Sequence, residues 1–197
     1  MKRLAAVAML LLVAVFAGFL LSANASAQMN MGWKTIFDGS SLDGWNMIGD
    51  ANWRLENGIA VADKGTGFLV SKDSYGDFEV RAEFWVDTKA NSGVFIRCSD
   101  PKAVTAVNAY EVNIFDERPD PSYGTGAIVN VGKPTTMIKA AGQWNTYDIT
   151  AQGTHFTIVL NGIKTVDVQD SKHDRGPIAL QYAAGVVKFR KVEIKAL

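Results

Sequence analysis

The stretch DFEVRAEFWVD, which runs from Asp77 to Asp87, decides the fold. Every even-numbered position from Phe78 to Val86 is apolar, whereas the odd-numbered positions are charged apart from Trp85. Side chains alternate between the two faces of a β-strand, so this pattern predicts a strand with one core face and one polar face. A helix would mix the acidic and apolar residues on the same faces.

Hairpin signals flank other strand-like runs. Asn57-Gly58 and Asn161-Gly162 each stand between two such runs. An Asn-Gly pair in this setting predicts a tight hairpin, because both central residues need a positive φ. Near the C-terminal end, the apolar positions change from odd (Val187, Phe189) to even, which predicts a β-bulge near Arg190-Lys191.

No segment longer than about ten residues shows a helical apolar period outside the N-terminal run. Many short strands with frequent turns indicate an all-β sandwich or closed barrel. The most irregular stretch is DERPDPSYGTG, from Asp116 to Gly126, whose prolines and glycines exclude a regular element. Such a loop is either functional or an insertion without a role.

The N-terminal residues have the features of an export signal. Lys2 and Arg3 precede an uncharged apolar run over 4–21, and the small residues Ala25-Ser26-Ala27 follow. This pattern predicts a signal peptide over 1–27 and a single mature domain over 28–197, exported to the periplasm or secreted. The alternative is an uncleaved anchor, since the run approaches membrane-spanning length.

Charge and cysteine content exclude some functions. Removing Lys2 and Arg3 from the twenty basic residues leaves 18 against 20 acidic ones. This balance gives no general attraction to nucleic acid. Cys98 is the only cysteine, so no intrachain disulfide can form. No second apolar run is long enough to predict a membrane span after cleavage.

Several blocks in order resemble the 3-keto-disaccharide hydrolase domain family, over nearly the whole mature chain. The blocks are GWKTIFDG (32–39), WRLENG (53–58), YGDFEVRAEF (75–84), NSGVFIR (91–97), YEV (110–112), WNTY (144–147) and GPIALQ (176–181). The resemblance implies a concanavalin A-like jelly roll, a sandwich of two packed antiparallel sheets. It also implies a carbohydrate partner, a disaccharide or glycoside already oxidised at C3.

One block departs from the family pattern. Family members expected to be active often read like LQDHG near the C terminus, whereas here Leu180-Gln181 is followed by YAAG, residues 182–185. If that missing His supplies a base or a metal ligand in the family, this chain lacks it. Whether the chain is catalytic is therefore left open by the sequence.

The substrate chemistry defines the groups that a site needs. A ketone at C3 acidifies the C2 hydrogen, so a base at C2 can drive elimination of the C1 group, and water then adds. A divalent metal ion could supply electrophilic help to the enolate oxygen. The chain is thus expected to be a glycoside hydrolase or lyase. The alternatives are a non-catalytic carbohydrate-binding module and a structural or partner-binding envelope protein.

The polar positions of the predicted strands give the candidate residues, on the condition that these strands adjoin in one sheet. The expected catalytic residues are Glu111, the leading acid–base candidate, with Arg97 as an oxygen ligand and Glu83. The expected substrate-binding residues are Arg81, Trp85, Asn91, Asn113 and Gln181. The alternative interpretation is that these residues are only the solvated face of a sheet.

Candidate metal ligands are few. Asp116 and Glu117 open the irregular loop and could bind a hard cation with nearby carbonyl oxygens. His155 and His173 have no second His or Cys at ligand spacing, so a zinc site is not expected. The sequence leaves the metal, the sugar, the linkage and the oligomeric state undefined.

Overall fold

The computed structural model describes residues 32–197, of which Lys34–Leu197 form one compact unit. The predicted signal peptide over 1–27 lies outside the described residues, so it stays a prediction. Within the described part of the chain, no helix is long and apolar enough to cross a membrane. The only helical element in that part is a short 3-10 helix, η1 (Pro121–Tyr123).

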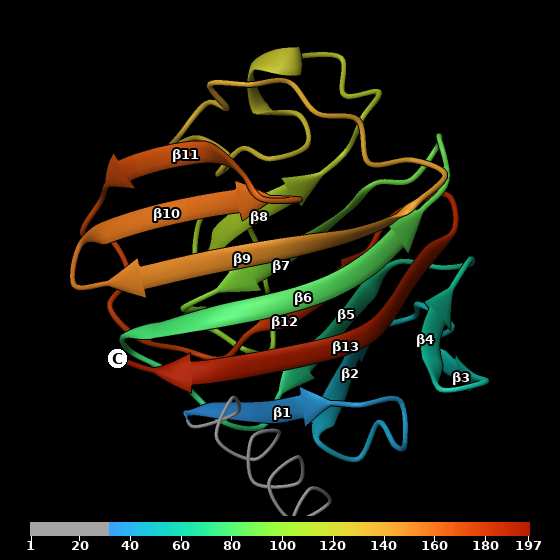
Figure 1. The fold of residues 1–197 in the computed structure, drawn as a ribbon. Helices are drawn as coiled ribbons and strands as arrows, with labels where there is room; N and C mark the ends of the chain where they lie inside the picture. Colours follow the sequence, from blue (N-terminus) through green and yellow to red (C-terminus); the bar gives the residue numbers. More distant parts are fainter. Residues whose placement is uncertain (1–31) are drawn as a thin grey trace, which may run out of the picture. The chain divides into compact units, whose positions relative to one another are not determined.

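Two antiparallel sheets make up the domain, and the larger has eight strands (Figure 1). Its order is β11-β10-β9-β6-β13-β4-β3, and β1 also pairs with β13. Its strands are β1 (Trp33–Phe37), β3 (Arg54–Glu56), β4 (Ile59–Ala62), β6 (Phe78–Val86), β9 (Trp144–Gln152), β10 (His155–Leu160), β11 (Ile163–Gln169) and β13 (Val187–Ala196).

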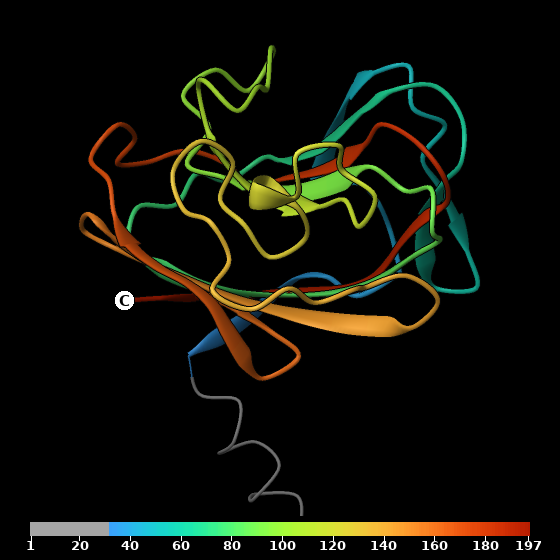
Figure 2. The same cartoon turned by 90° about the horizontal axis from the view of Figure 1, so that it is seen from above.

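The smaller sheet has five strands in the order β2-β5-β12-β7-β8. They are β2 (Trp45–Gly49), β5 (Gly67–Ser71), β12 (Ala179–Tyr182), β7 (Ser92–Ile96) and β8 (Tyr110–Ile114). Seen from above, the two sheets lie as two layers (Figure 2). This arrangement confirms the predicted sandwich of two packed antiparallel sheets.

The core lies between the two layers. The even-numbered residues of β6, from Phe78 to Val86, are buried there, as the alternation in the sequence predicted. They meet the inward side chains of β7, β8 and β12, such as Val94, Val112 and Leu180. Each sheet therefore has an outer face, and the two outer faces lie on opposite sides of the core.

The predicted turns and bulge are present. Asn57 and Gly58 have φ values of 51° and 78° between β3 and β4, and Asn161 and Gly162 have 52° and 80° between β10 and β11. The pairing of β13 with β6 shifts register between Phe189 and Lys191, which confirms the predicted bulge. The extra residue returns the apolar side chains of β13 to the core.

Candidate active site

Glu111 and two carboxamides lie on the outer face of the smaller sheet, which we call the Glu111 face. Glu111 of β8 stands opposite Phe95 of β7, and Phe95 stands opposite Ala179 of β12. One step along, Asn113 pairs with Gly93, and Gln181 pairs with Phe68 of β5. The sheet thereby brings together Glu111, Asn113 and Gln181, three of the residues nominated from the sequence.

Glu111 has the electrostatic environment of a general base. Glu111 is buried, with an exposed fraction of only 9%. Burial raises the pKa of this carboxyl from 4.5 to about 7, and the positive charge of Arg118 opposes the rise. No hydrogen bond to the carboxylate contributes to this pKa. A buried carboxyl that titrates near neutral pH is suited to take a proton from carbon.

Gly93 packs closely against the Glu111 side chain. A Cβ added at Gly93 would lie 3.2 Å from Phe95 Cε2, 3.2 Å from the Val112 carbonyl oxygen and 3.4 Å from Glu111 Cγ. Any larger residue would therefore press on the stem of Glu111. Gly93 is itself buried, and the Phe95 ring and the Glu111 stem pack closely around it.

The two carboxamides that flank Gly93 each have an unpaired oxygen. Asn113 Oδ1 and Gln181 Oε1 are buried and have no hydrogen-bond partner. The Asn113 Nδ2 group donates to the Tyr123 carbonyl oxygen at 2.6 Å, which holds η1 beside the Glu111 face. Buried polar atoms normally find a partner, so these oxygens point to a ligand or to ordered water.

The irregular loop over 116–126 is held in place by hydrogen bonds of Asp116. Asp116 accepts hydrogen bonds from the backbone N–H groups of Ala140 at 2.8 Å and Ala141 at 2.9 Å, and from the Thr125 hydroxyl at 2.6 Å. Glu117 is exposed and pairs with Lys139 at 3.2 Å. Asp116 thus anchors a loop, and its carboxylate already accepts hydrogen bonds from other residues of the protein.

The expected divalent cation has no matching set of ligands in the described chain. Among residues 32–197, no group of three or more His, Cys, Asp or Glu side chains could hold a metal ion. Since the Asp116 carboxylate is already hydrogen-bonded and Glu117 faces solvent, this pair does not fit a cation site.

Arg97 lies apart from the Glu111 face, contrary to the strand alternation. Strand β7 ends at Ile96, and Arg97 has a φ of 52°, so the two-residue period no longer applies. Its guanidinium instead lies 5.1 Å from the ring centre of the core residue Phe156. Arg97 is 1% exposed and donates to the carbonyl oxygens of Gly76, Gly153 and His173 and to Asp77 Oδ1. These bonds join three loops and give Arg97 a structural role.

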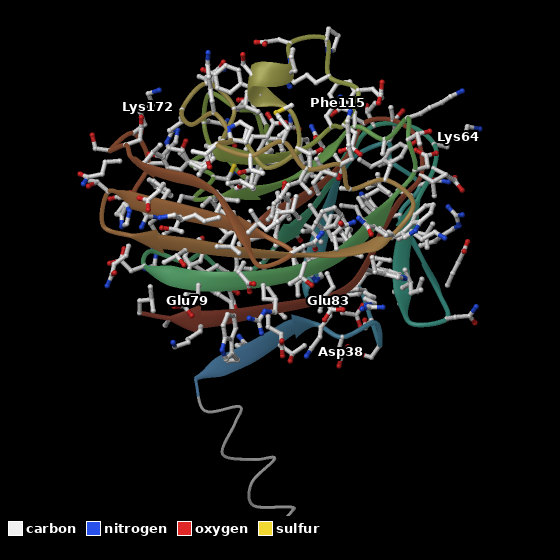
Figure 3. The ribbon with its side chains drawn as sticks, turned by 45° about the horizontal axis from the view of Figure 1, so that its top comes forward. Asp38, Lys64, Glu79, Glu83, Phe115 and Lys172 are labelled. Carbon is white, nitrogen blue, oxygen red and sulfur yellow. The ribbon has the colours of Figure 1, made fainter. Side chains whose placement is uncertain are left out.

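Three further candidates lie on the other sheet, contrary to the expectation of one continuous face. They are Arg81, Glu83 and Trp85, which project from the outer face of β6. Arg81 pairs with Asp148 at 2.6 Å, Glu83 pairs with Arg190 at 2.5 Å, and Lys188 lies over the Trp85 ring. Figure 3 shows Glu83 beside the large sheet and Phe115 among the loops beyond β8. The alternation correctly predicted the outward side of β6, but it does not show which strands share a sheet.

Asn91 stands at the rim of the smaller sheet. Its backbone N–H donates to the Ala184 carbonyl oxygen at 3.1 Å, just before β7 begins. It is half-buried and lies two residues before Gly93. The fold therefore places Asn91 near the end of the Glu111 face that Gln181 occupies.

Sequence reasoning missed two contributors to the face. Arg118 sits in the irregular loop, and only the folded loop brings its charge to bear on Glu111. Phe68 lies in a short run without clear alternation, and it packs edge-to-face on Phe95 at 5.2 Å between ring centres. A charged residue such as Arg118 inside a long loop could have been nominated from the sequence. No local pattern around Phe68 indicates its place on the face.

The two-layered fold carries, on one outer face, a carboxyl with a pKa near 7 beside two carboxamides whose oxygens are unpaired. The chain belongs to the family described as the 3-keto-alpha-glucoside-1,2-lyase-like domain, which matches residues 32–195. This result agrees with the resemblance noted from the sequence. Among curated proteins, none matches the chain significantly.

Solved structures show the same fold. One "putative glycosyl hydrolase" from Parabacteroides distasonis is 20% identical, with a TM-score of 0.78 over 87% of this chain and 96% of that one. A second protein of the same description and organism is 25% identical, with a TM-score of 0.71 over 84% and 99%. A carbohydrate-binding module from Bacillus subtilis is 17% identical, with a TM-score of 0.61 over 84% and 96%.

Proposed function

We propose that this protein cleaves 3-keto-glycosides, with Glu111 as the base that removes the C2 proton. The observation that carries the proposal is the Glu111 carboxyl, which is buried beside Gly93 and has a pKa raised to about 7. Family membership supports the substrate class, because the family is described by a 3-keto-glucoside lyase reaction. An exported location of the protein is proposed with it, on the N-terminal pattern of the sequence.

The reaction is an elimination followed by hydration. Glu111 takes the C2 proton, and the electrons of that C–H bond move into the C3 ketone to give an enolate. When the enolate re-forms the ketone, a C1=C2 double bond forms and the C1–O bond breaks. The departing oxygen takes a proton from solvent and leaves as an alcohol, while Glu111 gives up the C2 proton to solvent. Water then adds across the double bond, its hydroxyl to C1 and a proton to C2.

The other residues of the face orient the substrate. The carboxamides of Asn113 and Gln181 flank Gly93, where each unpaired oxygen can accept a hydrogen bond from a substrate hydroxyl. Arg118 adds a positive charge near Glu111, which favours the ionised base and an anionic intermediate. Each of these roles is carried out by a side chain of this protein.

The first test is turnover of a chromogenic 3-keto-glucoside by the purified protein and by two matched variants. Glu111→Gln keeps the shape of the side chain and removes the base, so release should fall by at least about 100-fold. Glu83→Gln makes the same change on the opposite outer face and should retain the wild-type rate. Equal loss in both variants, or no loss in Glu111→Gln, would contradict the role of Glu111.

A non-catalytic carbohydrate-binding module is the second candidate, favoured by the residue that follows Gln181. Tyr182 replaces the acid of the family pattern, its ring is buried in the core, and its hydroxyl donates to the Gly185 carbonyl oxygen at 3.1 Å. No chemistry at C1 can come from this residue. Absence of turnover together with calorimetric binding of a sugar would support the binding module and refute the enzyme.

A further inference from the structure

We propose that a cavity beside Gln181 is the subsite for the leaving group, and that it takes an aromatic aglycone with a hydroxyl group. We call it the Gln181 pocket; it is lined chiefly by Ile48, Thr66, Phe68, Val104, Gln181 and Tyr182. This inference rests on the proposed function, because it names the substrate class of the same site.

The pocket has the size and surface of an aromatic-ring site. Its volume is about 230 Å³, whereas a cavity of about 150 Å³ suffices for benzene. Phe68 and Ile48 project from the outer face of the small sheet, and they pack against the cluster that contains Val104. Val104 belongs to the loop over 99–109, which projects from the small sheet in Figure 2. Apolar walls of this kind favour burial of an aromatic ring.

The polar groups of the pocket are few, and one of them lacks a partner. Among the described residues that line it, none is charged. The Thr66 hydroxyl already contacts Asp50 Oδ1 at 3.3 Å. Gln181 Oε1 is left as a buried acceptor without a hydrogen bond. A second sugar ring would bring several hydroxyls and find few partners, whereas one hydroxyl on an aromatic ring would satisfy Gln181.

The pocket also lies in the direction that a leaving group would take. Glu111 is on β8, Gln181 is two strands away on β12, and Phe68 follows on β5. Two strand spacings come to about 10 Å. This lateral distance is comparable to the length of one sugar residue, and Gly93 and Phe95 of β7 lie between the two strands. We place C2 of the ring at Glu111 and C1 on the side of β12, so that the C1 substituent extends past Gly93 toward Phe68.

Binding of small probes tests the pocket without any turnover. Phenol, anisole and methyl glucoside would each be titrated into the purified protein, with the backbone amide resonances of Gly67, Ala103 and Ala183 as local reporters. Phenol should shift these resonances saturably, and anisole should bind about fivefold to tenfold more weakly because it cannot donate to Gln181.

Two variants make the binding test specific. Gln181→Met keeps the length of the side chain and should remove the preference for phenol over anisole. Val104→Asp places a charge over the pocket and should weaken both probes by at least about tenfold. Preferential binding of methyl glucoside at these amides, or no local shift with phenol, would overturn the proposal.

Turnover separates the pocket from the chemistry. The 3-keto-glucosides of 2-hydroxybenzyl alcohol and of glucose would be compared, and kcat/KM should favour the aromatic alcohol by at least about tenfold. Equal kcat/KM values would refute the subsite and leave the enzyme intact. Phenol binding without cleavage of either compound would refute the proposed function and leave the pocket intact.

Discussion

Replacing Glu111 by Gln should make the protein more stable at alkaline pH while it abolishes turnover. Burial raises the pKa of Glu111 from 4.5 to about 7. Between these values the folded state holds a proton that the unfolded state has lost. The free energy of unfolding therefore falls as the pH rises through this window, which is the reverse of the usual behaviour of a salt-bridged acid.

The magnitude follows from the width of the window. One pKa unit corresponds to about 1.4 kcal/mol, so ionised Glu111 costs about 3 kcal/mol of stability above pH 7. Gln cannot ionise, so the variant should escape this cost. For a domain of this size, about 3 kcal/mol corresponds to a rise in Tm of roughly 6–12 °C. Below pH 4.5 the two proteins should have similar stability, because Glu111 is then protonated in both states.

Urea unfolding of both proteins at several pH values from 4 to 9 measures this difference. The titration of other groups affects the variant and the wild type equally, so it cancels in the difference between their free energies of unfolding. Glu83→Gln serves as the control, since it removes an exposed ion pair worth less than about 1 kcal/mol and should show no gain at high pH. A difference for Glu111→Gln that does not change with pH would refute the raised pKa.

Four further results are expected. In steady-state assays, kcat/KM should rise about tenfold per pH unit below about pH 7 and then level off, because the base must be ionised; a flat profile would exclude Glu111 as the base. Gly93→Ala should lower kcat by about tenfold or more with a small loss of Tm, since the new methyl group lies against Glu111 Cγ; unchanged turnover would show that the position of the Glu111 side chain does not depend on Gly93. Arg97→Lys should lower the free energy of unfolding in urea by about 3 kcal/mol or more, because buried acceptors lose their donors, and a loss of activity without a loss of stability would contradict this structural role. Asp116→Asn should cost about 1–3 kcal/mol by the same assay, and an unchanged stability would argue against its anchoring role.

Local patterns predicted the elements of the fold because each depends on short-range geometry. The alternation in β6 and the Asn-Gly turns at 57–58 and 161–162 follow from the strand period and from a positive φ. The bulge after Phe189 was visible as a change of parity. These rules need only neighbouring residues, so one sequence suffices for them.

The site was less predictable because it depends on which strands adjoin. Glu83 and Glu111 have the same pattern of neighbours, yet β6 and β8 belong to different sheets and face opposite sides. Arg97 followed the alternation until a positive φ turned its side chain inward. The burial that perturbs Glu111 comes from tertiary packing, which strand alternation does not encode.

The position of β13 has a consequence for how the chain folds. This strand is the last in sequence, yet it lies in the middle of the large sheet between β6 and β4. Without residues 187–196, β6 can still pair with β9 and β4 with β3, but the edge that each of them turns toward β13 has no partner. The large sheet therefore cannot be completed until residues 187–196 have been synthesised, and pairing over such long sequence separations is slow. Until β13 is in place, β9 with β6 and β3 with β4 form two separate parts of the large sheet, and this last strand joins them into one layer.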